Sequence, residues 1–238
     1  MVSIATSIIA LFSGFLAVWA QFRISKSNRD FERLKLLEMK RLDSEFRSSV
    51  YKEPLLNAAF DLQSRLYNIL NMKFIEVYYL LGSERQRHYV INNTVFLFSQ
   101  YLAWTEAVRV DIQCIDLGNS EMTRRLSLMQ RNISSTLQSD RYNPILMVFA
   151  GEQRAIGERM LKSIDGKLSC IGFGEYLSSE FNLHDPLMEM LTDEVKKVAS
   201  NVLEASGRLS ALQHGLIDML DFLDPDFIRF PKERRGKV

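Results

Sequence analysis

The sequence predicts an all-α protein, and three observations lead to this fold class. Five prolines and eleven glycines are spread over 238 residues, so long helices are permitted along most of the chain. Apolar residues recur at spacings of three and four, which is the period of a helix packed on one face. No segment alternates apolar and polar residues strongly enough to predict a sheet. We therefore expect an N-terminal single transmembrane helix, a juxtamembrane helix, and a helical bundle with a long C-terminal heptad helix.

The first segment, residues 1–22, is predicted to be a transmembrane anchor. It has no charged side chain and is dominated by Ile, Leu, Phe, Ala and Val. About 20 such residues in a helix cross a hydrocarbon core of roughly 30 Å. Trp19 lies near the end of the run, where an indole suits the membrane interface.

A cleaved secretory signal and a buried soluble helix are the alternatives for residues 1–22. A signal needs basic residues ahead of its apolar core, and the first three residues supply none. Ala20 still resembles the small residue at a cleavage site, so the signal remains open. The absence of a basic start favours a permanent anchor.

Positive charge begins directly after the apolar run, with Arg23, Lys26 and Arg29. Over residues 23–41, seven basic residues outnumber three acidic residues. Because basic residues stay on the cytoplasmic side, we expect the N-terminus outside and the remaining chain in the cytoplasm. Arg23, Lys26 and Arg29 are thus the predicted membrane-flanking basic residues, and the lipid bilayer is a predicted partner.

Three further regions follow the predicted anchor. Residues 23–53 contain neither Pro nor Gly and predict a juxtamembrane helical stalk that ends before Pro54. Residues 54–223 are predicted to form the cytoplasmic helical bundle, with Pro54 at the first position of a new helix. Residues 224–238 form a basic tail, which we expect to fray.

An uncharged segment inside the predicted bundle, residues 88–105, raises the question of a second membrane span. It contains Asn92, Asn93 and Gln100, and amides in hydrocarbon need partners that an isolated helix cannot provide. This polarity favours a helix buried in the bundle.

The clearest regularity lies between Met188 and Leu223. This stretch has a heptad repeat with apolar residues at all a and d positions: Met188, Val195, Val202, Leu209, Leu216 and Leu223 at a, and Leu191, Val198, Ala205, Leu212 and Met219 at d. Such a seam predicts one helix of about 54 Å. The flanking e and g positions carry few charges, which favours packing within the chain over a coiled coil between chains. Self-association through the seam stays open.

The best candidate site lies in residues 149–160, FAGEQRAIGERM. On a helix, Gln153 falls within the apolar face, and Glu152 and Arg159 lie at its border. A buried glutamine or a Glu–Arg pair inside a bundle can hold a ligand. A satisfied amide and a structural ion pair explain the same pattern, with Gly157 allowing close helix approach. Glu152, Gln153 and Arg159 are therefore the possible ligand or interaction residues.

Composition and motifs argue against several functional classes. A net charge of +1, from 30 basic and 29 acidic residues, gives no electrostatic case for a nucleic-acid partner. Gly172-x-Gly174 lacks the third glycine of a dinucleotide-binding loop. The two cysteines and three histidines do not have zinc-site spacing. We expect no catalytic residue, no cofactor and no metal.

These predictions favour a single-pass membrane protein whose cytoplasmic body is a non-enzymatic interaction, sensing or scaffold module. A protein partner or self-association through helices is the predicted mode of interaction. Two alternatives remain. One is a membrane-acting effector, as in toxin or defence systems, and the other is a membrane-tethered enzyme with a site near Glu152, Gln153 and Arg159.

Overall fold

A computed structural model describes the backbone at residues 2–111, 120–164, 166–178 and 185–238. The side chains at 2–13, 15–18, 20, 40–50, 111 and 120 are outside the described part. The chain divides into two compact units, Met1–Phe46 and Arg47–Val238.

The described residues are predominantly helical, which confirms the predicted all-α class. The helical elements are α1 (Val2–Asn71), the π-helix η1 (Glu76–Leu80), α2 (Glu84–Asp111), α3 (Ser120–Gln138), α4 (Ala150–Met160), α5 (Phe173–Ser178), α7 (Pro186–Ser200), α8 (Val202–Leu223) and the 3-10 helix η2 (Lys232–Arg234). The strands are β1 (Leu161–Ile164) and β2 (Lys167–Cys170).

In the Met1–Phe46 unit, residues 2–46 belong to α1. Arg23, Lys26 and Arg29 are exposed on this helix, and the guanidinium carbon of Arg23 lies 5.0 Å from the ring centroid of Trp19. Most side chains of the predicted anchor, residues 1–22, lie outside the described residues. Across the part of the chain that the structure does describe, no helix is long and apolar enough to cross a membrane.

Helix α1 continues through Pro54, so the prediction that a stalk helix ends before this proline is wrong. A proline inside a helix removes one hydrogen bond and costs about 3 kcal/mol. Directly after it, Leu55 and Leu56 are buried, and Leu62 and Leu66 continue the buried face. Packing of this face against the bundle outweighs the local cost of the proline.

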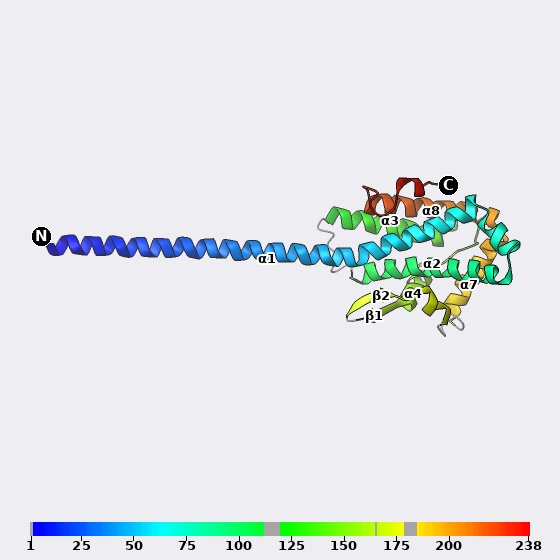
Figure 1. Cartoon of the computed structure of the whole chain (residues 1–238), viewed down its shortest axis with the longest axis horizontal. Coiled ribbons are helices and arrows are strands. Elements are labelled where there is room, and N and C mark those ends of the chain that lie inside the picture. The colour runs from blue at the N-terminus through cyan, green and yellow to red at the C-terminus, as the bar shows by residue number, and fades with distance from the viewer. Residues whose placement is uncertain (1, 112–119, 165, 179–184) are drawn as a thin grey trace. The chain divides into compact units, whose positions relative to one another are not determined.

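Within the Arg47–Val238 unit the helices form a bundle around one apolar core. Helix α3 lies along α8, and α4 and the strands lie on α2 (Figure 1). Leu66 of α1, Val95 of α2, Leu126 of α3 and Leu209 of α8 are all buried in this core. The predicted helical bundle is confirmed, and the uncharged segment at residues 88–105 is part of α2 within it.

The heptad seam is buried within the chain, but the prediction of one long helix is wrong. Helix α7 ends at Ser200 and α8 begins at Val202. Between them, Asn201 leaves the helical conformation with φ −142° and ψ 56°. All seam residues are buried except Val202, which is half-buried. Both helices turn their apolar faces toward the same core, so the repeat continues although the helix does not.

Strands β1 and β2 form an antiparallel hairpin that the sequence does not predict. Leu161 pairs with Cys170 at one end and Ile164 with Lys167 at the other. Each strand has four residues, which is too short for an apolar alternation to be recognised. The hairpin continues directly from α4 and covers part of α2 (Figure 1).

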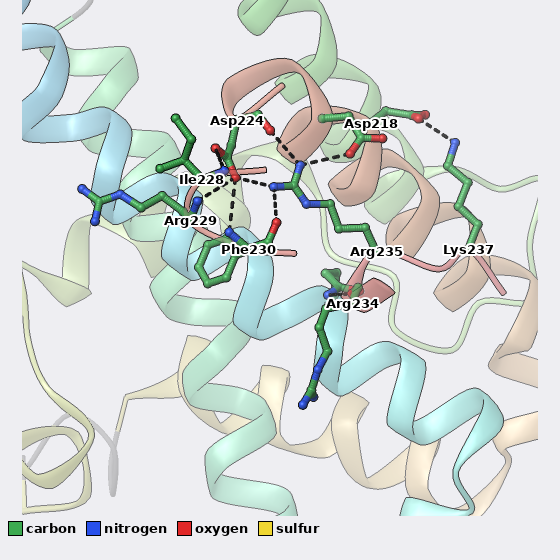
Figure 2. A network of polar contacts seen from close by, with 10 residues as sticks. Asp218, Asp224, Ile228, Arg229, Phe230, Arg234, Arg235 and Lys237 are labelled. Carbon is green, nitrogen blue, oxygen red and sulfur yellow. Dashed lines mark hydrogen bonds and ion pairs between the residues drawn. The ribbon is translucent and has the colours of Figure 1, made fainter. Parts of the chain in front are cut away.

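The basic tail, residues 224–238, is held by the bundle, so the expectation that it frays is wrong. The carboxylate of Asp224 accepts hydrogen bonds from the backbone N–H groups of residues 228–230, at 3.0, 3.2 and 3.3 Å. The guanidinium group of Arg235 pairs with this carboxylate and donates to the Phe230 carbonyl at 2.8 Å (Figure 2). Both charged side chains are buried.

Two buried glutamines bind the main chain of the tail. Gln63 Nε2 donates to the Arg234 carbonyl at 3.2 Å, and Gln213 Nε2 donates to the Gly236 carbonyl at 2.8 Å. Gln63 belongs to α1 and Gln213 to α8, and their exposed fractions are 1% and 0%. The main chain of the tail therefore supplies hydrogen-bond acceptors to two buried side chains, and the tail is part of the fold.

Candidate functional site: a polar pocket between α2, α3 and α4

Gly157 sets the close approach of α4 to α2. A Cβ atom at this position would lie 2.7 Å from the Leu102 carbonyl oxygen and 3.0 Å from Glu106 Cβ. These distances leave no room for a side chain, so only glycine permits the observed packing. The contact brings one face of α4 against the polar end of α2 near Glu106.

The structure does not bring Glu152 and Arg159 together. Glu152 Oε2 accepts a hydrogen bond from the Phe149 N–H at 2.8 Å and so caps the first turn of α4. Arg159 Nε lies 2.9 Å from Asp185 Oδ2, and Asp185 also caps α7 by accepting from the Leu187 N–H at 2.9 Å. Both predicted residues therefore make contacts that stabilise helix ends.

Gln153, the third predicted residue, is buried and holds α4 in place. Its Nε2 donates to the Val148 carbonyl at 2.8 Å and to the Ser134 carbonyl at 3.0 Å. The side chain thereby links α4 to α3 and to the loop that precedes α4. Gln153 also lines a pocket between three helices, so the structure places it at a cavity wall.

A buried arginine on α8 fixes the loop before α4. The guanidinium group of Arg208 donates to five backbone carbonyls at 2.6–3.1 Å, those of Thr136, Leu137, Ser139, Asn143 and Ile145. The first two belong to the last turn of α3, whose carbonyls lack partners within the helix. Burial lowers the pKa of Arg208 from its ordinary value. Through these contacts α8 positions the end of α3 and the start of α4.

A second charged residue supports the same loop. Glu194 of α7 is buried, and its Oε2 accepts a hydrogen bond from the Leu146 N–H at 2.6 Å. Leu146 has φ 60°, a left-handed conformation that is unfavourable for a leucine. The hydrogen bond and the full burial of the Leu146 side chain hold this strained residue in place.

The pocket beside Gln153 has a volume of about 400 Å³ and draws its lining from three helices. Each helix contributes one buried polar residue and one exposed arginine. The buried residues, here called the floor, are Glu106 of α2, Gln130 of α3 and Gln153 of α4. The exposed arginines, here called the rim, are Arg109 of α2, Arg131 of α3 and Arg154 of α4.

The acidic residue of the floor is neutralised by the rim arginine on its own helix. Arg109 donates through Nε to Glu106 Oε2 at 2.7 Å, and its second nitrogen contacts Glu106 Oε1. This hydrogen bonding raises the pKa of Arg109 above its ordinary value. Glu106 is 3% exposed, so the bidentate pair supplies the partner that a buried carboxylate requires.

Gln130 is the residue of the floor whose amide is not satisfied. Its side chain is 8% exposed, and its Nε2 has no hydrogen-bond partner among the described residues. A buried donor without a partner costs about 1–3 kcal/mol. Native proteins keep few such groups, and each one calls for an explanation, such as a bound water, an ion or a functional role.

Two rim arginines remain available for a ligand. Arg131 donates only weakly, from Nε to the Ser127 carbonyl at 3.4 Å. In the part of the chain that the structure describes, neither Arg131 nor Arg154 forms an ion pair. Three arginines and one glutamate give the pocket lining a net charge of +2. The pocket therefore presents positive charge, and one of its lining residues, Gln130, has a buried amide donor without a partner among the described residues.

The described residues give little support for a metal site or a cysteine nucleophile. No group of three His, Cys, Asp or Glu side chains there is placed to hold a metal ion. Burial raises the pKa of the Cys170 thiol to about 12, so this cysteine is protonated near neutral pH and is a poor nucleophile. The residues of the pocket between α2, α3 and α4 therefore favour binding of a ligand over catalysis.

Sequence reasoning found one floor residue and missed the others. Gln153 was detectable because it interrupts the apolar face of a helix. Glu106 and Arg109 form an i, i+3 pair, which is a local signal, but such pairs are common on exposed helix faces. Gln130 lies four residues after Leu126 and three before Ile133, so it interrupts the apolar stripe of α3 as Gln153 does in α4, and this signal was available but not used. Arg23, Lys26 and Arg29, which the sequence predicts to flank a membrane, lie on α1 in the other unit.

Comparison with known proteins finds no relative of this chain. No protein-family model, curated protein or solved structure matches the chain.

Proposed function

We propose that the chain is a membrane-tethered sensing module. Residues 1–22 anchor it in the bilayer with the N-terminus outside, and the Arg47–Val238 unit binds a small ligand in the cytoplasm. The uncharged length of residues 1–22 and the exposed basic residues Arg23, Lys26 and Arg29 support the anchor and its orientation.

The unsatisfied amide of Gln130 in the pocket between α2, α3 and α4 carries the proposal that the bundle binds a ligand. Concave sites with a few convergent polar groups are where proteins bind small molecules. Three helices contribute to the lining, so a ligand that prefers one arrangement of these helices shifts the population toward it. Binding in the pocket is thereby coupled to the packing of the bundle.

A non-enzymatic role agrees with the electrostatics of the pocket. Of the described residues that line it, Glu106 is the one carboxylate, and Arg109 engages both of its oxygens. A general base needs a carboxylate that is free to accept a proton from the substrate. The pocket therefore suits recognition better than proton transfer.

An exposed apolar surface near η1 supports a protein partner for the sensing module. Met72, Val77, Tyr78, Leu80 and Leu81 have exposed fractions of 61%, 45%, 43%, 58% and 78%. Clustered exposed apolar side chains of this type are common at protein interaction sites. Because the heptad seam is buried inside the chain, this surface is the better candidate for contact with another protein.

Membrane fractionation tests the anchor. The full chain is expected in the membrane fraction, and a chain that lacks residues 1–22 is expected in the soluble fraction with its helical content retained. A reporter fused after Val238 should be active on the cytoplasmic side. Replacing Arg23, Lys26 and Arg29 together by Gln should leave membrane association intact and mix the two orientations, because basic flanks set topology.

Two results would contradict the anchor. One is a full chain that is soluble after cell disruption. The other is a reporter that is active only on the outer side of the membrane.

A further inference from the structure

We propose that the pocket between α2, α3 and α4 binds a small oxyanion, an organic carboxylate or a phosphate group, through Arg131, Arg154 and the amide of Gln130. This inference rests on the proposed function, because it names the ligand class of the same site. It follows from which charged side chains of the lining are ion-paired within the protein and which are not.

The charge balance of the pocket selects an anion. Arg109 and Glu106 neutralise each other through a bidentate pair. Arg131 and Arg154 lie on two different helices at the rim, and neither is ion-paired within the described residues. Arginine side chains bind carboxylate and phosphate oxygens through two parallel N–H donors. Two such groups from α3 and α4 can close on one oxyanion.

The polarity of the floor selects the same ligand. Gln130 offers an N–H donor that no described residue accepts. Gln153, in contrast, spends its N–H donors on the Ser134 and Val148 carbonyls, so it shapes the floor without offering a free donor there. A donor in a buried site binds a charged acceptor more strongly than a neutral one. A ligand oxygen that reaches Gln130 would remove the cost of the unsatisfied amide.

The size of the pocket limits the ligand to a small molecule. Its volume of about 400 Å³ falls at the lower end of the range for small-molecule sites. Its lining consists of eleven residues from the three helices. A peptide or a nucleic-acid strand would need a longer surface.

Titration of the full chain in detergent with three probes tests the ligand class. Succinate and inorganic phosphate are the two oxyanions, and succinamide is the uncharged control with nearly the same shape as succinate. At constant ionic strength, we expect calorimetric binding of succinate or phosphate and an increase in Tm, because a ligand that binds only the folded state stabilises it. Comparing the Kd of succinate with the Kd of phosphate then shows whether the pocket prefers a carboxylate or a phosphate group.

Variants of the rim and floor show that the binding is in this pocket. Arg131→Gln and Arg154→Gln are each expected to weaken the Kd by about tenfold or more, because each removes a charge-assisted hydrogen bond. Gln130→Leu should weaken it as well. Arg124→Gln, an exposed position on α3 outside the pocket lining, is the matched control and should leave the Kd unchanged.

Three outcomes would overturn the inference. Succinamide binding as tightly as succinate would exclude an oxyanion site and leave the proposed sensing function standing with an uncharged ligand. Equal effects of Arg154→Gln and Arg124→Gln would place the binding outside the pocket. Failure of both oxyanions to bind or to raise the Tm would exclude this ligand class, while the stability of Gln130 variants would still report on whether the pocket is a ligand site.

Discussion

Replacing Arg208 by Met is expected to lower the free energy of unfolding by about 4 kcal/mol. The guanidinium group donates to five backbone carbonyls, at the end of α3 and in the loop before α4. Methionine fills much of the same volume but donates no hydrogen bond, so several buried carbonyls lose their partner. The effect should exceed that of a typical core substitution because one side chain satisfies so many groups.

Urea unfolding of the full chain in detergent, followed by far-UV circular dichroism, measures this effect. Arg141→Met is the matched control, since Arg141 is exposed in the same loop. It should change the free energy of unfolding by less than about 0.5 kcal/mol. Similar losses for the two variants would mean that Arg208 does not organise the loop as described.

The second large effect is expected at the buried pair of the tail. Asp224→Asn should lower the free energy of unfolding by about 3 kcal/mol, because the buried Arg235 loses its buried carboxylate partner and keeps only the ion pair with the exposed Asp221. Burial alone would raise the pKa of Asp224, but three backbone N–H donors and Arg235 outweigh it and lower the pKa below the ordinary value of 3.8. The carboxylate is therefore charged in the folded protein at neutral pH.

The pH dependence of this loss follows from the lowered pKa. A carboxyl group with a lower pKa in the folded state contributes stability above its unfolded pKa, and this contribution is lost as pH falls through the folded value. The difference between wild type and Asp224→Asn should be constant well above pH 3.8 and shrink below it. Asp226→Asn, an exposed neighbour, is the control and should give no such difference. A difference that grows on acidification would contradict the assigned pKa direction.

The sequence predicts which residues are buried more reliably than it predicts where helices end. The heptad repeat identifies the seam, because apolar periodicity records which side of a helix faces the core. It does not detect the break at Asn201, because α7 and α8 both face that core and the apolar register continues across it. At Pro54 the sequence predicts a helix end that the structure does not have. Tertiary packing of Leu55 and Leu56 overrides the strong local signal of the proline.

Charged residues show why the candidate site was only partly predictable. Arg208 and Glu194 occupy flanking positions of the heptad, where charged side chains normally reach solvent. Both are buried because the loop between α3 and α4 folds over them and supplies backbone partners. A loop of this kind has no periodicity, so the sequence does not reveal its position. The pocket depends on the same loop, since it sets where α4 meets α2 and α3.

We propose that Gln130 is kept for a ligand, whereas Gln153 is kept for the fold. The most direct measurement compares the free energies of unfolding of Gln130→Leu and Gln153→Leu in the full chain without added ligand. Gln153→Leu should lose about 2 kcal/mol, because the Ser134 and Val148 carbonyls lose their donor. Gln130→Leu should be unchanged or up to about 1 kcal/mol more stable, because it removes an unsatisfied buried amide. A loss at Gln130 as large as that at Gln153 would show that its amide is satisfied inside the protein, and would contradict the account.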